Sequence, residues 1–360
     1  MKIKLGKLTK IRTGKLDANA SSENGQYPFF TCSKEPLKID TYSYDCECVL
    51  VAGNGDLNVK YYNGKFDAYQ RTYILEDNGS GRLYMPYLYF FMNDYVEELR
   101  KQAIGGVIKY IKLGNLTDAL IELPDIETQK EIVRVLKKAK SIIEYREQEV
   151  QKLDELVKAR FVELFGDPVS NSKNLPELTL PELGEFGRGV SKHRPRNDPK
   201  LLGGEYPLIQ TGEVANSELY ITSYENTYSE LGLKQSKMWK AGTLCITIAA
   251  NIAKTAILTF DACFPDSVVG FKANDKTSNI FIHYWFSFFQ AILEAQAPES
   301  AQKNINLKIL SELKIIVPPI EQQNEFVTFV EQTDKSKVVV QKALDEAQTL
   351  FDSLMQQYFG

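Results

Sequence analysis

The chain contains one short segment twice, as Leu123-Pro124-Asp125-Ile126-Glu127-Thr128-Gln129 and as Val317-Pro318-Pro319-Ile320-Glu321-Gln322-Gln323. The two copies are 194 residues apart (318 − 124 = 194), and the same shift places Phe165-Gly166 onto Phe359-Gly360 without a gap. Self-similarity at a fixed distance is the sequence signature of a repeated architecture. We therefore expect two related halves that share one fold.

A long helix is predicted to follow each copy of this segment. Pro124 and Pro318 stand just before the helical pattern, and Glu127 and Glu321 lie in the first turn, where the helix dipole favours acidic side chains. No proline interrupts the next forty residues of either copy, which allows helices about 60 Å long. The predicted spacer helices cover 124–166 and 318–360.

Apolar residues recur along both predicted helices at heptad-like spacing. Two long helices with one apolar stripe each, in one chain, most simply bury these stripes against each other. This predicts that the two helices pair along their apolar stripes and act as a spacer. The predicted seam consists of Leu136, Ile143, Val150, Val157, Leu164, Val340, Leu344, Ala347, Phe351, Leu354 and Tyr358.

The regions that precede the helices, 1–123 and 167–317, are rich in Tyr, Phe, Thr, Val and Gly. This composition, with turn residues between short apolar runs, predicts strands mixed with helices. The predicted fold class is therefore α+β, with two similar domains separated by two long helices. Strands are predicted at 48–52, 71–75 and 244–248, and helices at 88–99 and 280–293.

The net charge of −4 and the pI of about 5.6 argue against a simple basic nucleic-acid binder. The acidic residues are unevenly spread, since residues 320–359 alone hold three Lys or Arg against seven Asp or Glu. Residues 1–16 and 186–197 contain several Lys or Arg and no acid. Local basic surfaces are therefore expected on an acidic chain.

The sequence also predicts a reducing compartment. It has five cysteines, an odd number, without the paired C-x-x-C spacing of a zinc ribbon. It has no apolar leader at its start and no run of eighteen uncharged apolar residues. We expect a soluble, cytoplasmic protein with reduced, mostly buried thiols at Cys32, Cys46, Cys48, Cys245 and Cys263.

No catalytic or cofactor-binding motif is found in the sequence. It lacks G-x-x-x-x-G-K-[ST] and G-x-G-x-x-G loops, and Pro318-Pro319 lacks the neighbours of an amino-methyltransferase motif. The carboxylates within 125–130 are too closely spaced for a metal nuclease. The only histidines are His193 and His283, and His283 fits a packed helix position better than a general base. We expect no catalytic residue, bound cofactor or metal in this chain.

Over its whole length the sequence resembles the specificity subunits of type I restriction-modification systems. The two proline segments that open the helices carry the resemblance, together with Tyr206-Pro207-Leu208-Ile209-Gln210-Thr211-Gly212-Glu213, 242–247 and 266–270 in the second domain. The first domain is shorter and keeps only Tyr27-Pro28-Phe29-Phe30-Thr31 of the corresponding pattern.

The resemblance implies two target recognition domains held apart by two long antiparallel coiled-coil helices, with pseudo-twofold symmetry. Each domain would read one half of a bipartite, asymmetric DNA site, and the helices would set the gap between the halves. The resemblance also implies two methyltransferase subunits docked along the helices, and restriction and translocase subunits that join through them. S-adenosylmethionine, ATP and Mg²⁺ would then belong to these partner subunits.

Cations and polar side chains of the recognition domains are the candidates for DNA contact. The loop within 186–197 contains Gly and Pro and suits entry into a groove, and 1–16 is its first-domain counterpart; a solvated surface charge is the alternative for each cation. Gln210 and Thr211 could read a base edge or satisfy the end of a strand. The candidate DNA-binding residues are Lys10, Arg12, Lys15, Arg188, Lys192, His193, Arg194, Arg196, Gln210 and Thr211.

Two other functions are compatible with the pattern. A coiled-coil adaptor would bind proteins through both domains and would show no salt-dependent affinity for DNA. An enzyme with a fused specificity region would need the cofactor motifs that the sequence lacks.

Overall fold

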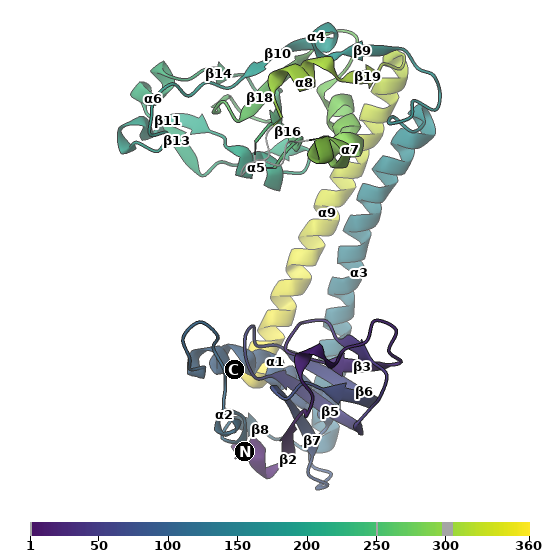
Figure 1. Ribbon diagram of the computed structural model, residues 1–360, viewed down its shortest axis with the longest axis vertical. Coiled ribbons are helices and arrows are strands. Elements are labelled where there is room, and N and C mark those ends of the chain that lie inside the picture. The colour runs from purple at the N-terminus through teal and green to yellow at the C-terminus, as the bar shows by residue number, and fades with distance from the viewer. Residues whose placement is uncertain (1, 250, 297–304) are drawn as a thin grey trace. The chain divides into compact units, whose positions relative to one another are not determined.

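The computed structural model describes residues 2–249, 251–296 and 305–360 (Figure 1). The chain forms two compact units: unit 1 is Met1–Gln148 with Val340–Gly360, and unit 2 is Glu149–Val339. Two helices of 40 residues, α3 (Ile126–Phe165) and α9 (Ile320–Phe359), each contribute to both units. Each unit therefore combines one globular domain with part of both long helices.

Unit 1 contains a six-stranded sheet with the strand order β2-β7-β5-β6-β3-β4. Neighbouring strands are antiparallel except β3 and β6, which are parallel. A short antiparallel pair, β1 with β8, holds the start of the chain beside the segment that leads into α3. The elements are β1 (Lys2–Lys4), β2 (Thr9–Thr13), β3 (Tyr27–Phe30), β4 (Leu37–Ile39), β5 (Tyr44–Ala52), β6 (Val59–Ala68), β7 (Thr72–Asp77), α1 (Met85–Gln102), α2 (Leu113–Thr117) and β8 (Leu120–Glu122).

Unit 2 contains a five-stranded sheet with the order β10-β18-β15-β16-β12 and a four-stranded sheet with the order β13-β11-β17-β14. The pair β9 with β19 repeats the arrangement of β1 with β8. The elements are β9 (Glu177–Thr179), α4 (Leu180–Leu183), β10 (Gly184–Arg188), β11 (Leu202–Leu208), α5 (Thr211–Asn216), β12 (Tyr220–Ile221), β13 (Asn226–Tyr228), α6 (Glu230–Lys234), β14 (Met238–Trp239), β15 (Leu244–Thr247), β16 (Thr255–Leu258), β17 (Ala262–Cys263), β18 (Val268–Ala273), α7 (Asn279–Gln296), α8 (Leu307–Glu312) and β19 (Lys314–Ile316).

The internal repeat is visible in the bounds of the elements. Both ends of α1 and α7, of β8 and β19, and of α3 and α9 differ by 194 residues. The strand regions before α1 and α7 diverge, since unit 1 has one six-stranded sheet where unit 2 has two sheets. The predicted α+β class with its internal repeat is confirmed, and the predicted strands and helices overlap β5, β7, β15, α1 and α7.

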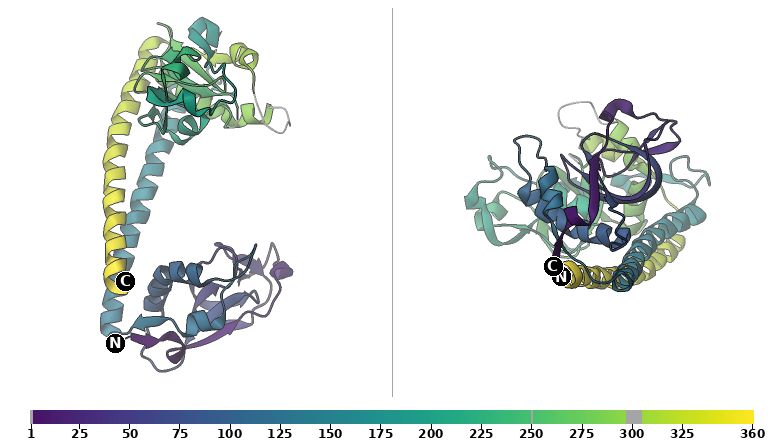
Figure 2. Two further views of the ribbon diagram at one scale, coloured as in Figure 1. Left: turned by 90° about the vertical axis from the view of Figure 1, so that its left-hand side faces the viewer. Right: turned by 90° about the horizontal axis from the view of Figure 1, so that it is seen from below.

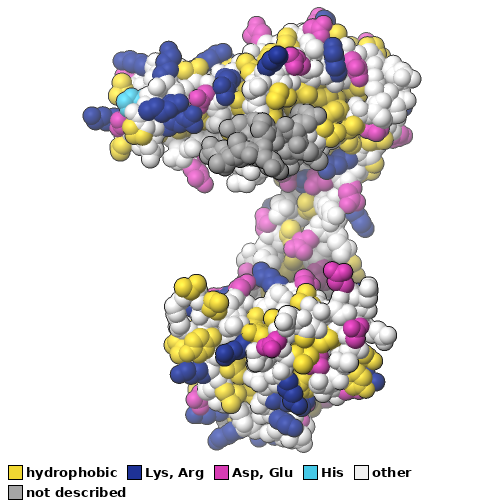
Figure 3. Space-filling model, in the orientation of Figure 1, with side chains coloured by type: hydrophobic (Ala, Val, Ile, Leu, Met, Phe, Trp, Pro, Cys, Tyr) yellow, Lys and Arg dark blue, Asp and Glu magenta, His cyan; other side chains and the backbone are white. Residues whose placement is uncertain are grey.

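The surface carries charges of both signs. Lys and Arg side chains lie among Asp, Glu and hydrophobic side chains on the face drawn in Figure 3. In the described ranges no helix combines the length and the apolar character needed to cross a membrane. The net charge of −4 is thus compatible with local basic surfaces.

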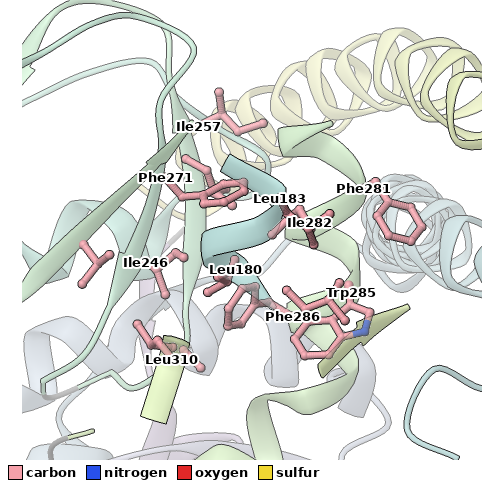
Figure 4. Packing of buried hydrophobic residues seen from close by; sticks show 14 of the residues in the cluster. Leu180, Leu183, Ile246, Ile257, Phe271, Phe281, Ile282, Trp285, Phe286 and Leu310 are labelled. Atoms are coloured by element: carbon pink, nitrogen blue, oxygen red, sulfur yellow. The ribbon is translucent and has the colours of Figure 1, made fainter. Parts of the chain in front are cut away.

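The core of unit 2 lies between its five-stranded sheet and α7. Figure 4 shows Ile246 and Phe271 of the sheet on one side and Phe286 of α7 on the other, and all three side chains are fully buried. Phe281 points away from the sheet and stacks on Phe161 of α3 with ring centroids 5.3 Å apart. Helix α7 therefore joins the sheet to the long helix.

The two long helices run antiparallel within each unit. In unit 2, Phe161 near the end of α3 contacts Phe326 near the start of α9, with ring centroids 5.3 Å apart. In unit 1, Leu136 near the start of α3 belongs to the same apolar core as Met355 near the end of α9. The views of Figure 2 show α3 and α9 side by side.

The predicted heptad seam describes only part of the helix packing. A second apolar stripe, which the sequence interpretation missed, packs against the globular domains as well as the partner helix: Ile132, Val133, Phe161, Phe165, Phe326, Val330 and Met355. Of the predicted seam, Leu136, Ile143, Val157 and Val340 are buried, and Val150, Leu164, Leu344, Ala347, Phe351, Leu354 and Tyr358 are partly buried.

One glutamine fixes the start of each long helix to its domain. Gln129 is fully buried; its Nε2 donates to the carbonyls of Arg82 and Pro124, both at 2.9 Å, and its Oε1 accepts from the backbone N–H of Tyr84 at 2.8 Å. Gln323, 194 residues later, is also fully buried. The segment just before α1 is thereby tied to the first turn of α3.

Gln323 makes the equivalent contacts in unit 2. Its Nε2 donates to the carbonyls of Lys276 at 3.0 Å and Pro318 at 2.9 Å, and its Oε1 accepts from the hydroxyl of Thr277 at 2.9 Å. Lys276 is 194 residues after Arg82, so the repeat includes this loop. Buried polar groups that lose such partners are costly.

His283 lies on α7, and its Nδ1 is 2.9 Å from the hydroxyl of Thr255 on β16. Burial lowers the pKa of His283 to about 4, so its imidazole is neutral at neutral pH. The side chain therefore occupies the packed helix position that the sequence favoured.

Replacing Gln323 by Leu should destabilise unit 2 by about 2–3 kcal/mol, because two carbonyls and a hydroxyl lose a buried partner. Urea unfolding followed by tryptophan fluorescence measures this, since both tryptophans, Trp239 and Trp285, lie in unit 2. The matched control is Gln322→Leu, at the exposed neighbouring position. Equal stability of the two variants would show that the glutamine is not an anchor.

Replacing His283 by Asn should flatten the dependence of stability on pH. The folded-state pKa lies below the unfolded value of about 6.5, so the unfolded chain binds more protons, and the wild type loses stability as pH falls from about 6.5 towards 4. The loss relative to His283→Asn should reach about 2 kcal/mol by about pH 5. Urea unfolding at several pH values checks this, and parallel profiles for the two proteins would contradict it.

Candidate nucleic-acid interface

The basic segment of the second domain begins where β10 ends. A side chain at Gly189 would overlap the backbone carbonyls of Phe264 and Pro265, so only glycine allows the chain to pass this point. Arg188, the last residue of β10, is exposed just before this close approach. The end of the strand thus presents a cation at the surface.

The loop after Gly189 is held by side-chain contacts at its base. The Oε1 of Gln235 accepts from the backbone N–H groups of Lys192 at 2.7 Å and His193 at 3.0 Å. The ring of His193 lies 3.1 Å from Asp198, and the backbone N–H of Lys200 helps to hold the pKa of Asp198 below its usual value. The loop therefore has a defined shape.

Asp266 pairs with two arginines of this loop. Its carboxylate forms an ion pair with Arg196 and lies 3.5 Å from the guanidinium of Arg194. Arg194 also donates to the carbonyls of Ser191 at 2.6 Å and His193 at 2.8 Å. Arg194 therefore braces the loop, whereas no acidic partner for Arg188 or Lys192 is found in the part of the chain that the structure describes.

Two adjoining hollows bring together four of the predicted DNA-binding residues. Gln210, Thr211 and Arg196 line a hollow of about 360 Å³, and Arg188 and Arg196 line a second one of about 280 Å³. Arg196 is shared by both hollows. Side chains that can contact phosphates and side chains that can contact base edges therefore converge from β10, the basic loop and the start of α5.

The predicted residues of the first domain are more dispersed. Lys10 and Lys15 are exposed on β2 and just after it. Arg12 is engaged within the sheet: its Nε lies 2.6 Å from a carboxylate oxygen of Glu76 on β7, and its guanidinium lies 4.7 Å from the centre of the Tyr44 ring. Arg12 therefore stabilises the sheet, and Lys10 and Lys15 are the accessible cations.

The ends of β2 and β10 are structurally alike. A side chain at Gly14 would overlap the carbonyls of Ala68 and Tyr69, as one at Gly189 would in unit 2. The two glycines are followed by Lys15 and Val190. Both domains therefore pass a close backbone approach at the place where the candidate basic residues lie.

Sequence reasoning missed the acids and amides that shape this surface. Asp266 and Gln235 position the basic loop, and Ser267 and Asn306 line the hollows beside Arg188 and Arg196. Asp266 and Ser267 belong to a segment that the family resemblance had singled out. Nothing in the local sequence around Gln235 indicates its role, which depends on a contact across more than forty residues.

Besides the basic surface, the metal-ligating side chains and the cysteines bear on what the chain can do chemically. Within 2–249, 251–296 and 305–360, no three His, Cys, Asp or Glu side chains are placed to hold a metal ion. All five cysteines are free thiols. Burial raises the pKa of Cys46, Cys48, Cys245 and Cys263, which keeps these thiols protonated.

Comparison with known proteins matches the sequence to the family described as type I restriction modification DNA specificity domain, over residues 1–155 and 177–347. The type I restriction enzyme EcoDI specificity subunit of Escherichia coli is 27% identical over 391 residues, which cover 98% of this chain and 85% of that protein. A putative specificity subunit of Haemophilus influenzae is 21% identical over 320 residues, covering 86% of this chain and 80% of that protein.

A solved structure shows the same fold. The crystal structure of the type I restriction-modification S subunit from M. genitalium aligns with a TM-score of 0.63 at 15% identity, covering 100% of this chain and 96% of that chain. The sequence match spans both halves of the repeat, so an adaptor without DNA readout is not favoured. The chain belongs to the type I restriction-modification DNA specificity family and is the non-catalytic subunit that gives such a complex its DNA sequence specificity.

Proposed function

We propose that each globular domain reads one half of a bipartite DNA site and that the second domain does so with Arg188, Arg196, Gln210 and Thr211. The observation that carries this proposal is the convergence of these four residues on two adjoining hollows. Guanidinium groups suit phosphate oxygens and guanine edges, whereas an amide suits an adenine edge. In the first domain, Lys10 and Lys15 contact the phosphate backbone.

The ion pairs of Asp266 keep the basic loop ready for DNA. The side chains of Arg194 and Arg196 are 55% and 46% exposed, so their pairs with Asp266 are weak in water. A phosphate can therefore take over one arginine while Asp266 continues to hold the other. Because the loop is already ordered in the free protein, less conformational entropy is lost when DNA binds.

We propose two methyltransferase subunits as partners, with restriction subunits joining through them. Apolar side chains remain exposed on the long helices: Tyr145 (69%) and Leu350 (56%) in unit 1, and Val338 (70%) and Val339 (69%) in unit 2. Contiguous exposed apolar surface marks interaction sites, and the neighbouring Val338 and Val339 are the strongest candidate for such a surface. S-adenosylmethionine, ATP and Mg²⁺ are assigned to the partners.

The acidic lining of a groove in unit 1 indicates which kind of partner segment could dock there. It has a volume of about 620 Å³ between α1, α3 and α9, and its lining includes Asp94, Glu144, Glu147 and Asp352 but a single lysine, Lys140. A basic amphipathic helix of a methyltransferase subunit would match this lining.

We also propose the cytoplasm as the working compartment. Five free thiols are consistent with this proposal.

Replacing both Arg188 and Arg196 by Ala should weaken DNA binding by the assembled complex and reduce the slope of log affinity against log salt by about 0.9 for each lost phosphate contact. Fluorescence anisotropy at several salt concentrations measures the slope, on a duplex whose site is taken from mapped methylated adenines. Lys200→Ala is the matched control, since Lys200 is an exposed cation near the same loop. If the double variant keeps the wild-type slope, as the control is expected to do, the hollows are not a phosphate site.

Replacing Gln210 by Ala should relax the preference for one base pair in one half of the site, with a loss of discrimination of about 1–3 kcal/mol. Genome-wide mapping of methylated adenines in cells that carry the variant measures the change. Asn216→Ala, at the exposed far end of the same helix α5, should leave the site unaltered. An altered base in both halves would contradict the assignment of one half-site to each domain.

A further inference from the structure

We propose that the hairpin between Ile104 and Tyr110 of the first domain is an apolar wedge that inserts between base pairs of the bound DNA. Its tip is formed by Val107, which is fully exposed, and Ile108, which is 62% exposed. Ile104, Tyr110 and Leu113 are exposed beside them. Hydrophobic side chains gather over the loop between α1 and α2 in Figure 3, with Lys and Arg side chains around them.

Backbone hydrogen bonds hold the base of the hairpin, and this fixed base keeps the tip exposed. Ile104 and Tyr110 exchange two backbone hydrogen bonds, at 3.0 and 2.8 Å. Below them, the N–H of Gly55 donates to the carbonyl of Lys109 at 2.9 Å, and the N–H of Ile111 donates to the carbonyl of Gly53 at 2.9 Å. The tip is therefore presented by a hairpin anchored to the end of β5.

The charges around the tip match a nucleic acid. Residues 99–117 contain four Lys or Arg and no Asp or Glu. Arg100 and Lys101 pair with acids of α1 and its surroundings, but within the described ranges Lys109 and Lys112 have no acidic partner. Apolar side chains between free cations are the arrangement by which architectural proteins unstack a base step while contacting the adjacent phosphates.

The repeat places the base of this hairpin at the candidate DNA surface. A shift of 194 residues takes Ile111 to Ile305, whose N–H donates to the carbonyl of Ile248 at 3.0 Å, as that of Ile111 does to Gly53. Ile248 and Ile305 line the hollow that contains Arg188 and Arg196. Ile111, at the base of the hairpin, therefore corresponds to Ile305, which in unit 2 borders the proposed DNA contacts.

The sequence of the proposed tip is not repeated in the second half of the chain, where the corresponding positions lie outside the described residues. The same shift takes Val107 and Ile108 to Ala301 and Gln302, a small and a polar residue. Only one half of the bipartite site would therefore be unstacked. The difference also supplies a test variant, because the second repeat itself provides the replacement residues.

The inference rests on the proposed DNA-reading function, and its test uses the full chain assembled with its methyltransferase subunits. The probe is a duplex carrying the mapped site, with 2-aminopurine placed in turn at each base step of both half-sites. Apart from the methylated adenines, which the methyltransferase subunits flip out of the stack in either half-site, the wild-type complex should raise the 2-aminopurine fluorescence at a step of one half-site only. Binding without any such rise would overturn the wedge, whereas absence of binding would overturn the proposed function itself.

The variant Val107→Ala/Ile108→Gln should lose this fluorescence signal and bind about tenfold more weakly, with an unchanged salt slope, because an apolar contact releases no counterions. The control Lys109→Ala should show the opposite pattern, with a smaller slope and a retained signal. Sedimentation of the assembled complex tests the rival role of the tip. If the double variant no longer binds the methyltransferase subunits, or keeps the wild-type signal, the hairpin is not a DNA wedge.

Discussion

The buried amides of Gln129 and Gln323 are the contacts on which the arrangement of each unit depends. Each amide joins the loop before a domain helix to the proline segment and the first turn of a long helix. An amide can donate and accept at once, so one side chain satisfies backbone groups from two segments that are far apart in sequence. A long helix amplifies any error at its start, because a small change in its direction grows along its length. Fixing the first turn therefore fixes where the rest of the helix meets its partner.

Electrostatics explains how an acidic chain can serve as a DNA reader. The charges that matter are arranged locally, since Asp266 organises two arginines, and the hairpin at 104–110 lies in a segment without acids. A single carboxylate that pairs weakly with two exposed guanidinium groups leaves positive charge available to a phosphate. Net negative charge lies instead on α9, which holds three Lys or Arg against seven Asp or Glu and belongs to the proposed docking surface of the partner subunits.

The sequence predicts the long helices well and the strand regions poorly, for a physical reason. Helix bounds depend on local signals, and the predicted 124–166 and 318–360 exceed α3 and α9 by two residues at the start and one at the end. Strand order depends on pairings between distant residues, so neither the six-stranded sheet of unit 1 nor the two sheets of unit 2 could be read from composition. The same limit applies to Arg12, because nothing near it in sequence indicates that Glu76 lies on the neighbouring strand.

The two ends of the helix pair differ at a repeated seam position that is apolar in one unit and charged in the other. Ile143 is a buried seam residue in unit 1, whereas its repeat partner Lys337 bonds Asp154 and Glu218, both at 2.6 Å, in unit 2. Burial acts to lower the pKa of Lys337, and its bonds to the two carboxylates outweigh burial and raise it. Helix α3 on its own, packed antiparallel against a second copy, would place Ile143 opposite Asp154, an apolar side chain against an unpaired carboxylate. Pairing within one chain instead gives Asp154, whose side chain is 55% exposed, the partner Lys337, a contact worth little in water but absent from the paired copies. The pseudo-twofold repeat is thus asymmetric at its seam, because one half has an apolar side chain where the other has an ion-paired lysine.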